Sequence, residues 1–235
     1  MTLGRDVGVP EMVLRGERRH ATVLLADVVD STALLETLGS EAWVEMMNRV
    51  FQIAGSEIYR YGGEIDQFRG DGLVAFFGAG SAHENDPERA VLAALQMQSA
   101  VKGYAQDVAR SYGIELRLRV GINTGEVIVT QVGDRARHFE QTAMGAAVAL
   151  AARMESAAEP GTVLVSAHTY RLLTDAFVWQ PLGEITVKGV RHPVSVYRPL
   201  RPKPRQATSR RGRESLAGLD SPLVGRQREF RTLQR

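Results

Sequence analysis

ATVLLADVVDST, residues 21–32, combines the pattern of a buried strand with the start of a helix. Residues 21–28 form an apolar run rich in valine and leucine, of strand length, and Asp27 stands at its end. Such a run is typical of a central strand. Asp30, Ser31 and Thr32 are good N-cap residues, and apolar residues then recur at helical spacing up to Gly62. We therefore predict a strand, a carboxylate at its end and a long helix.

A second acid follows at the tip of a predicted hairpin. Two short apolar-containing runs, 64–68 and 73–77, flank Arg69-Gly70-Asp71-Gly72, which is typical of a tight turn. Asp71 alone is explained equally well as a favourable Asp-Gly turn residue. Asp27 and Asp71 side by side, however, would form the clustered oxygen site that hard divalent cations prefer. The pair therefore suggests two-metal phosphoryl transfer on a triphosphate.

The rest of the chain predicts a mixture of helices and strands without a regular β-α-β repeat. The predicted elements are a helix from Pro87 to Gly113, strands at 116–122 and 126–132 joined by a turn at 123–125, a helix at 142–157, a strand at 163–166, a helix at 168–174 and a hairpin of 184–188 with 194–198. This order favours an α+β fold over a doubly wound α/β fold.

Composition limits the class of protein. With 235 residues and 44% hydrophobic content, one domain with flanking segments is expected. Cysteine is absent, which excludes disulfides, thiolate catalysis and cysteine-ligated zinc, and a cytoplasmic location is expected. No apolar stretch approaches the roughly 20 residues of a membrane helix. The excess of basic residues lies within 201–213, so we expect neither nucleic acid nor membrane as a partner.

Four segments together resemble the class III nucleotidyl cyclases, the adenylate and guanylate cyclases. They are ADVVDST (26–32), GGEIDQFRGDG (62–72), GINTG (121–125) and GAAVALAARM (145–154), in the order of the family over about residues 18–199. The resemblance implies a palm-like α+β fold with a ferredoxin-like core. It also implies a head-to-tail homodimer with active sites at the interface, and conversion of a nucleoside triphosphate to the 3′,5′-cyclic nucleotide and pyrophosphate.

The resemblance further implies the roles of individual residues. In the family two Mg²⁺ or Mn²⁺ ions are held by two acids of one protomer, which correspond to Asp27 and Asp71. Val28, Ser31 and Thr32 belong to the segment that meets the phosphates, and Lys188 matches a lysine-glycine signature that could contact a phosphate, although an exposed strand lysine is an equal alternative. The second protomer contributes base-selecting, ribose-orienting and phosphate-binding groups, and its arginine corresponds to Arg153.

Arg153 is the last of four residues, Thr142, Gly145, Ala149 and Arg153, that are spaced to share one helix face. A fixed guanidinium facing a triphosphate is the expected role of Arg153. The alternative is a solvated arginine paired with a neighbouring glutamate.

The sequence departs from the family at four positions. Gln67 and Thr142 stand where the family has its base-selecting lysine and aspartate, yet both can still donate and accept hydrogen bonds to a purine. Threonine at the second position occurs in many bacterial members that make cyclic AMP, so ATP is preferred and GTP is the alternative. Ala149 replaces the asparagine that holds the ribose, so low activity is expected. Asp30 replaces a glycine, and a helix N-cap facing away from the nucleotide is its expected role.

The boundaries predicted from the sequence are a leader at 1–19, a cyclase domain at 20–199, a Pro/Arg-rich linker at 200–221 and a fourth segment at 222–235. PLVGRQRE (222–229) resembles the opening of an AAA-type ATPase domain, so downstream ATPase or signalling domains of a longer chain are expected. Two functions remain open: an adenylate cyclase of low intrinsic activity, and a regulatory nucleotide-binding or dimerisation module that has lost turnover.

Overall fold

The computed structural model describes residues 15–132, 140–186 and 193–204. The fold described below is that of the compact unit Met1–Pro202, and a second unit comprises Lys203–Arg235.

One mixed sheet organises the described residues. Its eight strands are β1 (Arg15–Val28), β2 (Glu64–Arg69), β3 (Gly72–Phe77), β4 (Leu118–Val132), β5 (Glu140–Met144), β6 (Val163–Ser166), β7 (Phe177–Ile185) and β8 (Val194–Pro202). They run in the order β2-β3-β1-β4-β6-β8-β7, and β5 pairs with β4 off this path. Among the strand pairs of the described residues, β4 and β6 alone are parallel. The predicted α+β class is confirmed.

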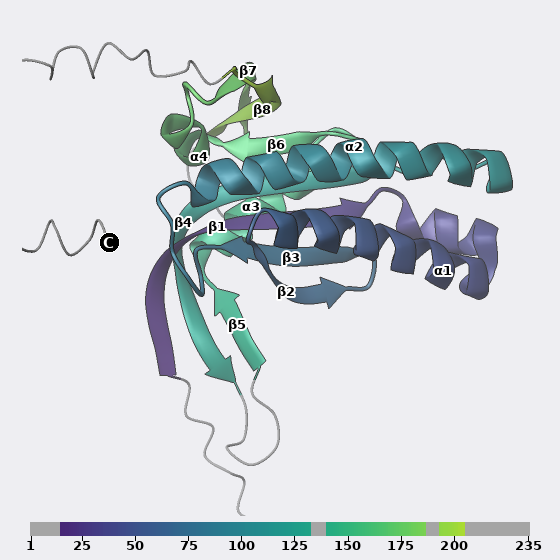
Figure 1. The fold of residues 1–235 in the computed structure, drawn as a ribbon, viewed down its shortest axis with the longest axis horizontal. Coiled ribbons are helices and arrows are strands. Elements are labelled where there is room, and N and C mark those ends of the chain that lie inside the picture. Colours follow the sequence, from purple (N-terminus) through teal and green to yellow (C-terminus); the bar gives the residue numbers. More distant parts are fainter. Residues whose placement is uncertain (1–14, 133–139, 187–192, 205–235) are drawn as a thin grey trace, which may run out of the picture. The chain divides into compact units, whose positions relative to one another are not determined.

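Helices cover both faces of the sheet, and the alternation of side chains along β1 shows why. Leu24, Ala26 and Val28 belong to the larger core, which includes α1 (Ser31–Arg60) and α2 (Asp86–Tyr112). Val23 and Leu25 point to the opposite face and pack with residues of α3 (Ala146–Ala157). The period of two in a strand thus gives each helical layer its own apolar stripe. Figure 1 shows α1 and α2 side by side in front of the sheet.

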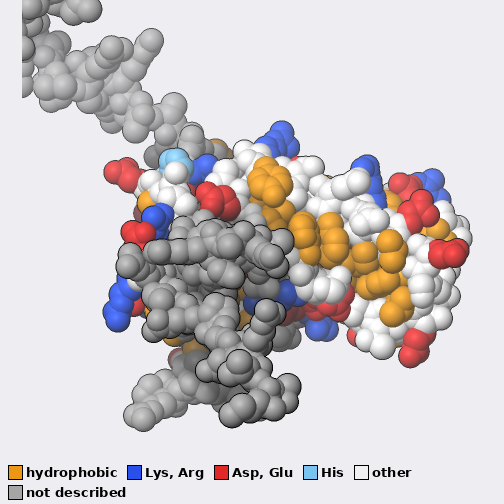
Figure 2. All heavy atoms as spheres, turned by 90° about the horizontal axis from the view of Figure 1, so that it is seen from below, with side chains coloured by type: hydrophobic (Ala, Val, Ile, Leu, Met, Phe, Trp, Pro, Cys, Tyr) orange, Lys and Arg blue, Asp and Glu red, His pale blue; other side chains and the backbone are white. Residues whose placement is uncertain are grey.

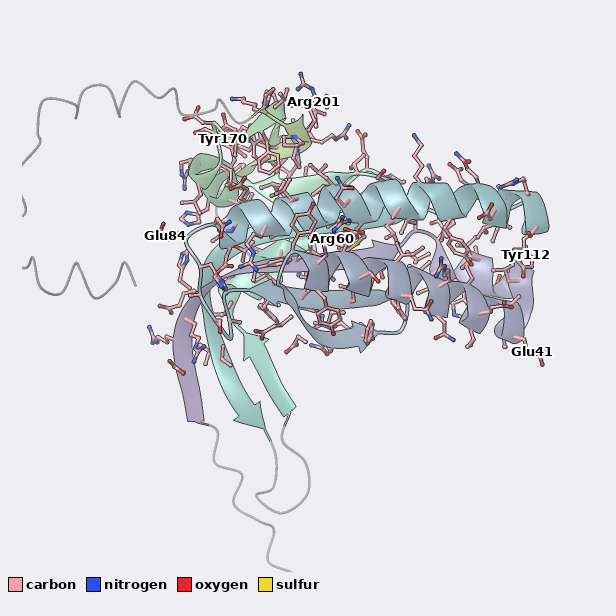
Figure 3. All side chains as sticks on the ribbon, in the orientation of Figure 1. Glu41, Arg60, Glu84, Tyr112, Tyr170 and Arg201 are labelled. Carbon is pink, nitrogen blue, oxygen red and sulfur yellow. The ribbon has the colours of Figure 1, made fainter. Side chains whose placement is uncertain are left out.

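The long helices are antiparallel neighbours. In Figure 3, Glu41 of α1 and Tyr112, the last residue of α2, lie at one end of the pair, and Glu84 lies just before the other end of α2. A kink at Gly39, whose φ is 76°, divides α1 into a short first part and a long second part. Large hydrophobic side chains remain exposed on α1 (Leu35, Val44, Tyr59) and β2 (Phe68). Figure 2 shows that hydrophobic side chains gather in a band on the face seen from below.

The short helix α4 (Ala167–Leu172) follows β6 and begins at a side-chain cap, in which the Ser166 hydroxyl accepts a hydrogen bond from the backbone of Thr169. Tyr170 on this helix stacks on Tyr197 of β8, with ring centroids 3.7 Å apart. Figure 3 shows Tyr170 beside the β7–β8 hairpin. No helix within the described residues has the length and apolar character needed to cross a membrane.

Two predictions for the middle of the sheet are wrong. The predicted turn at 123–125 lies inside β4, which runs unbroken through these residues, and β1 begins at Arg15, within the predicted leader. The reason is mutual pairing: β1 and β4 pair over their whole length, from Arg15 opposite Gln131 to Val28 opposite Leu118. A continuous ladder satisfies the backbone of both strands, so the local turn preference of an Asn-Thr-Gly sequence does not prevail.

The start of the alanine-rich helix is also corrected. Thr142 lies on strand β5, with its backbone opposite Thr130 of β4, and the helix begins only at Ala146 after Gly145. Thr142 therefore does not share a helix face with Ala149 and Arg153. The final hairpin is formed by β7 and β8, and β7 ends at Ile185, earlier than the predicted strand 184–188. In Figure 1 the first half of β1 and the second half of β4, together with β5, project below the rest of the sheet as an arm.

Candidate active site

Asp27 and Asp71 meet because β1 and β3 are antiparallel neighbours in the sheet. Asp27 lies opposite Gly72 in the register, and the Val28 amide donates a hydrogen bond to the carbonyl of Asp71 at 3.1 Å. Figure 1 shows that β1 ends at the same end of the sheet as the β2–β3 turn. The predicted position of Asp71 at a hairpin tip is thereby confirmed. Two residues 44 positions apart in the sequence become neighbours through one strand pair.

Gly72 makes the close approach of the two acids possible. A Cβ atom at this position would lie 2.6 Å from the carbonyl oxygen of Ala26 and 2.7 Å from Oδ1 of Asp27. Both distances are shorter than any ordinary carbon contact. Any other residue at 72 would push the hairpin away from β1, so the glycine after Asp71 has a steric reason beyond the turn itself.

The first turn of α1 borders the two carboxylates. The Ser31 hydroxyl donates a hydrogen bond to the Asp71 carboxylate, which holds that side chain against the start of the helix. Asp30 adopts the left-handed conformation, with φ 55°, and is exposed. It occupies the N-cap position as predicted, but its side chain makes no cap hydrogen bond. Aspartate is among the few residues that accept this conformation, so it can replace glycine here at modest cost.

The electrostatics show that negative charge is concentrated at this point. Burial, the nearby carboxylate of Asp71 and then that of Glu155 raise the pKa of Asp27 to about 7, and Arg119 opposes the shift. Burial, followed by repulsion from Asp71, also raises the pKa of Glu155, against the opposing effect of Arg119 and a hydrogen bond from Ser156. Without a cation, this group of carboxylates is therefore electrostatically unfavourable when fully ionised.

The donor set fits a nucleotide-bound divalent cation better than a complete protein cage. Within the residues that the structure describes, no group of three or more histidine, cysteine or acidic side chains is arranged to hold a metal ion by itself. Mg²⁺ and similar hard ions usually take one or two carboxylates and complete their coordination with phosphate oxygens and water. Asp27 and Asp71 supply that kind of partial site, beside a helix N-terminus that favours phosphate.

Glu155 and Arg119 were missed from the sequence. Arg119 lies on β4 directly opposite Asp27 in the β1–β4 register. Glu155 lies on α3, two residues after Arg153, on the face that packs over β4. The strand register could have indicated Arg119, but only if β4 had been predicted as one strand paired with β1. Glu155 had no local signal, because a glutamate in a helix is ordinarily solvated.

The residues assigned to the partner side of the site lie on α3 and at the edges of the sheet. Ala149 and Arg153 are one helical turn apart on α3, and both are exposed. Among the ion pairs of the described residues none involves Arg153. The alternative of an arginine paired with a neighbouring glutamate is therefore not what the structure shows.

The two base-selecting candidates lie on β2 and β5, which contact each other. Gln67 is half-buried beside an irregularity in the β2–β3 register, and its Nε2 donates to the Asp66 carboxylate at 3.1 Å. The backbone of Thr142 lies on β5. Of the phosphate-side candidates, Val28 is buried and Thr32 is exposed on the first turn of α1. Lys188 lies outside the described residues.

Comparison with known proteins gives a family match and similar solved structures. The family model described as the adenylate and guanylate cyclase catalytic domain matches residues 15–198. Among solved structures, the adenylyl cyclase CyaB from P. aeruginosa is 35% identical with a TM-score of 0.75, and the match covers 82% of this chain and 98% of that one. The guanylyl cyclase Cya2 is 31% identical with a TM-score of 0.74, over 82% of this chain and 97% of the other.

Curated relatives are longer proteins. Adenylate cyclase 1 of Rhizobium meliloti is 31% identical over 183 residues, which is 77% of this chain and 27% of the relative. An uncharacterized protein of Mycobacterium tuberculosis is 34% identical over 196 residues, which is 81% of this chain and 33% of the relative. The chain thus spans a third or less of these two relatives.

Proposed function

Because the chain belongs to the class III adenylate and guanylate cyclase family, we propose that it converts ATP to 3′,5′-cyclic AMP and pyrophosphate in a site shared by two protomers. One observation carries the proposal. The β1–β3 pair places Asp27 and Asp71 side by side at the N-terminal end of α1. The two carboxylates repel each other, and within the described residues they are not part of a larger cluster of metal-ligating side chains. Such a site is suited to the cations that accompany a nucleoside triphosphate.

In the proposed reaction the ribose 3′-oxygen forms a bond to the α-phosphorus, the bond from that phosphorus to the bridging oxygen of the β-phosphate breaks, and the 3′-hydroxyl proton is released. Two Mg²⁺ or Mn²⁺ ions, held by Asp27 and Asp71, would activate the attacking oxygen and neutralise charge on the leaving pyrophosphate. Ser31 orients the Asp71 carboxylate. The backbone of residues 28–32 and the start of α1 receive the phosphates.

The second half of the proposed site comes from α3 of the other protomer. Arg153 is exposed on α3 and free of an intramolecular ion pair among the described residues, as expected for a guanidinium that awaits a partner's triphosphate. A two-fold homodimer would build two equivalent sites in this way. Exposed hydrophobic side chains on α1 and β2 supply apolar surface that a second copy could cover.

We propose adenine as the preferred base and a low kcat for the reaction. Gln67 and Thr142 belong to strands that contact each other. An amide and a hydroxyl can each donate and accept hydrogen bonds, so this pair of residue types is compatible with a purine. Ala149 is exposed on α3 but has no polar group with which to orient the ribose. Loss of one preorganised donor typically lowers turnover by about 10²- to 10³-fold.

We further propose, from the tail sequence, that residues 222–235 open an ATPase region of a longer signalling protein that acts in the cytoplasm. The curated relatives are themselves longer than this chain, which supports only the greater length in this proposal.

A product assay tests the proposed function. The purified chain is incubated with Mn²⁺ and either ATP or GTP, and the cyclic nucleotide is identified by chromatography and mass spectrometry. We expect cyclic AMP to form faster than cyclic GMP, and Asp71→Asn to abolish both. The matched control is Asp107→Asn, which neutralises an exposed aspartate on α2 outside the site and should leave the rate unchanged.

The result also decides the second candidate function. Ala149 favours a module that binds nucleotide but no longer turns it over. Metal-dependent ATP binding without any cyclic product in this assay would support that module and contradict the proposed enzyme.

A further inference from the structure

A chain of buried polar side chains lies where β1, β4 and α4 meet, away from the metal acids, and its member Asn123 faces α3. It comprises Thr22 on β1, Asn123 and Thr124 on β4, Ser166 at the start of α4, and Thr169 on α4. None of the five is more than 3% exposed. The hydroxyls of Thr22 and Thr124 are 2.9 Å apart, and Thr169 donates to Thr124 at 3.0 Å. Buried groups of this kind are costly unless every partner is in place, so they favour one arrangement of the elements that they join.

Asn123 connects this chain to α3 and uses both ends of its amide. Its Nδ2 donates to the carbonyl of Ala147 at 3.0 Å, and its Oδ1 accepts from the Ser166 hydroxyl at 2.7 Å. Ala147 lies in the first turn of α3. A carbonyl oxygen has two acceptor sites, so that of Ala147 can take the bond from Asn123 in addition to a helical bond. The amide therefore links the helix backbone to the sheet, with its orientation fixed from the other side by Ser166.

The neighbours of Asn123 on the same face of β4 are glycines that bring the helix very close. A Cβ at Gly121 would lie 2.0 Å from the Glu155 nitrogen and 2.3 Å from the Ala151 oxygen. A Cβ at Gly125 would lie 3.1 Å from Cβ of Ala147. The backbone of α3 thus packs directly against the backbone of β4. Of the three alternate positions 121, 123 and 125 on this face of β4, two are glycines without a side chain. Such a surface allows close packing but gives few directional contacts, and the Asn123 hydrogen bond is one that holds the helix backbone itself.

From this geometry we propose that Asn123 is a positioning residue, which fixes α3 on β4 and thereby places Arg153 for the nucleotide. The proposal rests on the proposed function, because it concerns the half of the site that α3 supplies. Arg153 follows Ala147 by six residues, or about 9 Å along a helix axis. A shift of about 1 Å in a positioned group can lower turnover about 10²-fold. Loss of the Asn123 amide should therefore lower kcat about 10- to 100-fold, with KM changed less than threefold.

The test exploits the two halves of the composite site. An Asp71→Ala chain and an Arg153→Ala chain are mixed, so that the single intact site of the heterodimer takes its metal acids from the second chain and its α3 from the first. Asn123→Ala is then added to one chain at a time. We expect the restored activity to fall at least tenfold when Asn123→Ala is on the Asp71→Ala chain, and to stay within twofold when it is on the Arg153→Ala chain.

A role in general stability would lower the activity equally in both placements, and that result would overturn the proposal, as would no loss in either. Asn123→Asp is the second variant, because it still accepts from Ser166 but has no N–H for Ala147. Full activity of Asn123→Asp on the Asp71→Ala chain would also contradict the assignment.

A readout other than activity separates this proposal from the proposed function. If mixing the Asp71→Ala and Arg153→Ala chains restores no activity, the proposal of an active site shared by two protomers is refuted. Amide hydrogen exchange in the single Asn123→Ala variant then tests whether Asn123 positions α3. Faster exchange confined to α3, with β1 and α2 unchanged, supports it. Unchanged exchange in α3 overturns it.

Discussion

Replacing Asp27 by asparagine should make the metal-free protein more stable at pH 8. The pKa of this carboxyl is raised from 3.8 to about 7 by burial and by the charges of Asp71 and Glu155. An acid whose pKa is higher in the folded state than in the unfolded state lowers the stability of the fold at any pH at which the unfolded chain ionises. The penalty is absent below about pH 4, grows as the pH rises towards 7, and is complete above it. Asparagine keeps the shape and removes the charge.

The magnitude follows from the same values. At about 1.36 kcal/mol for each tenfold change in acidity, a pKa of about 7 instead of 3.8 corresponds to a ceiling of about 4 kcal/mol. Asp27 is only partly buried, so solvent screening reduces this ceiling, and a gain of about 2 kcal/mol is expected. For a domain of this size, that raises Tm by about 4–8 °C.

The assay is urea unfolding of the wild type and Asp27→Asn in EDTA at pH 8 and at pH 5. The gain of the variant should be larger at pH 8 than at pH 5, and Asp107→Asn, which removes an exposed carboxylate on α2, serves as the control. Mn²⁺ with ATP should stabilise the wild type but not Asp27→Asn. A variant that is no more stable than the wild type at pH 8, or equally more stable at both pH values, would refute the electrostatic account of the site.

Three further predictions follow from the site. Asp71→Ala should abolish the Mn²⁺-dependent component of ATP binding, because it removes one of two carboxylates available to the cations; calorimetry showing unchanged metal-dependent affinity would remove the metal site. Ala149→Asn should raise kcat at least about tenfold with little change in nucleotide affinity, since an amide there would act mainly in the transition state; steady-state kinetics that show slower turnover would mean that another group supplies the donor. Gly72→Ala should abolish activity, because its Cβ would meet Asp27 Oδ1 at 2.7 Å, whereas Gly103→Ala on α2, which has open space around it, should be fully active in the same assay.

The parts of the site that sequence patterns predicted are those with local signals. Asp27 ends an apolar strand and Asp71 follows a glycine in a turn, and both signals depend on a few adjacent residues. Their meeting required only that two neighbouring strands pair. The sequence likewise predicts a helix at Ala149 and Arg153, because the surrounding run is rich in alanine, which favours helix locally.

What could not be predicted depends on pairing between distant residues. Thr142 lies on a strand because β5 pairs with the far half of β4, although its own surroundings resemble a helix start. The sequence around Asn123 resembles a turn. Asn123 is nevertheless buried, because β1 pairs with β4 on both sides of this position and α3 packs on the face of the sheet above it. Arg119 becomes a neighbour of Asp27 only through that same register. In each case a tertiary contact outweighs the local preference.

Complementation between two inactive chains tests most directly whether one active site is built from two protomers. Asp71→Ala lacks a metal acid and Arg153→Ala lacks the α3 guanidinium, so each homodimer contains two defective sites. Mixing them should restore cyclic AMP formation from Mn²⁺-ATP, because half of the sites in each heterodimer are intact, and about a quarter of wild-type activity is expected for random 1:1 pairing. A mixture no more active than either variant alone would contradict the placement of the metal acids and Arg153 on opposite sides of one nucleotide.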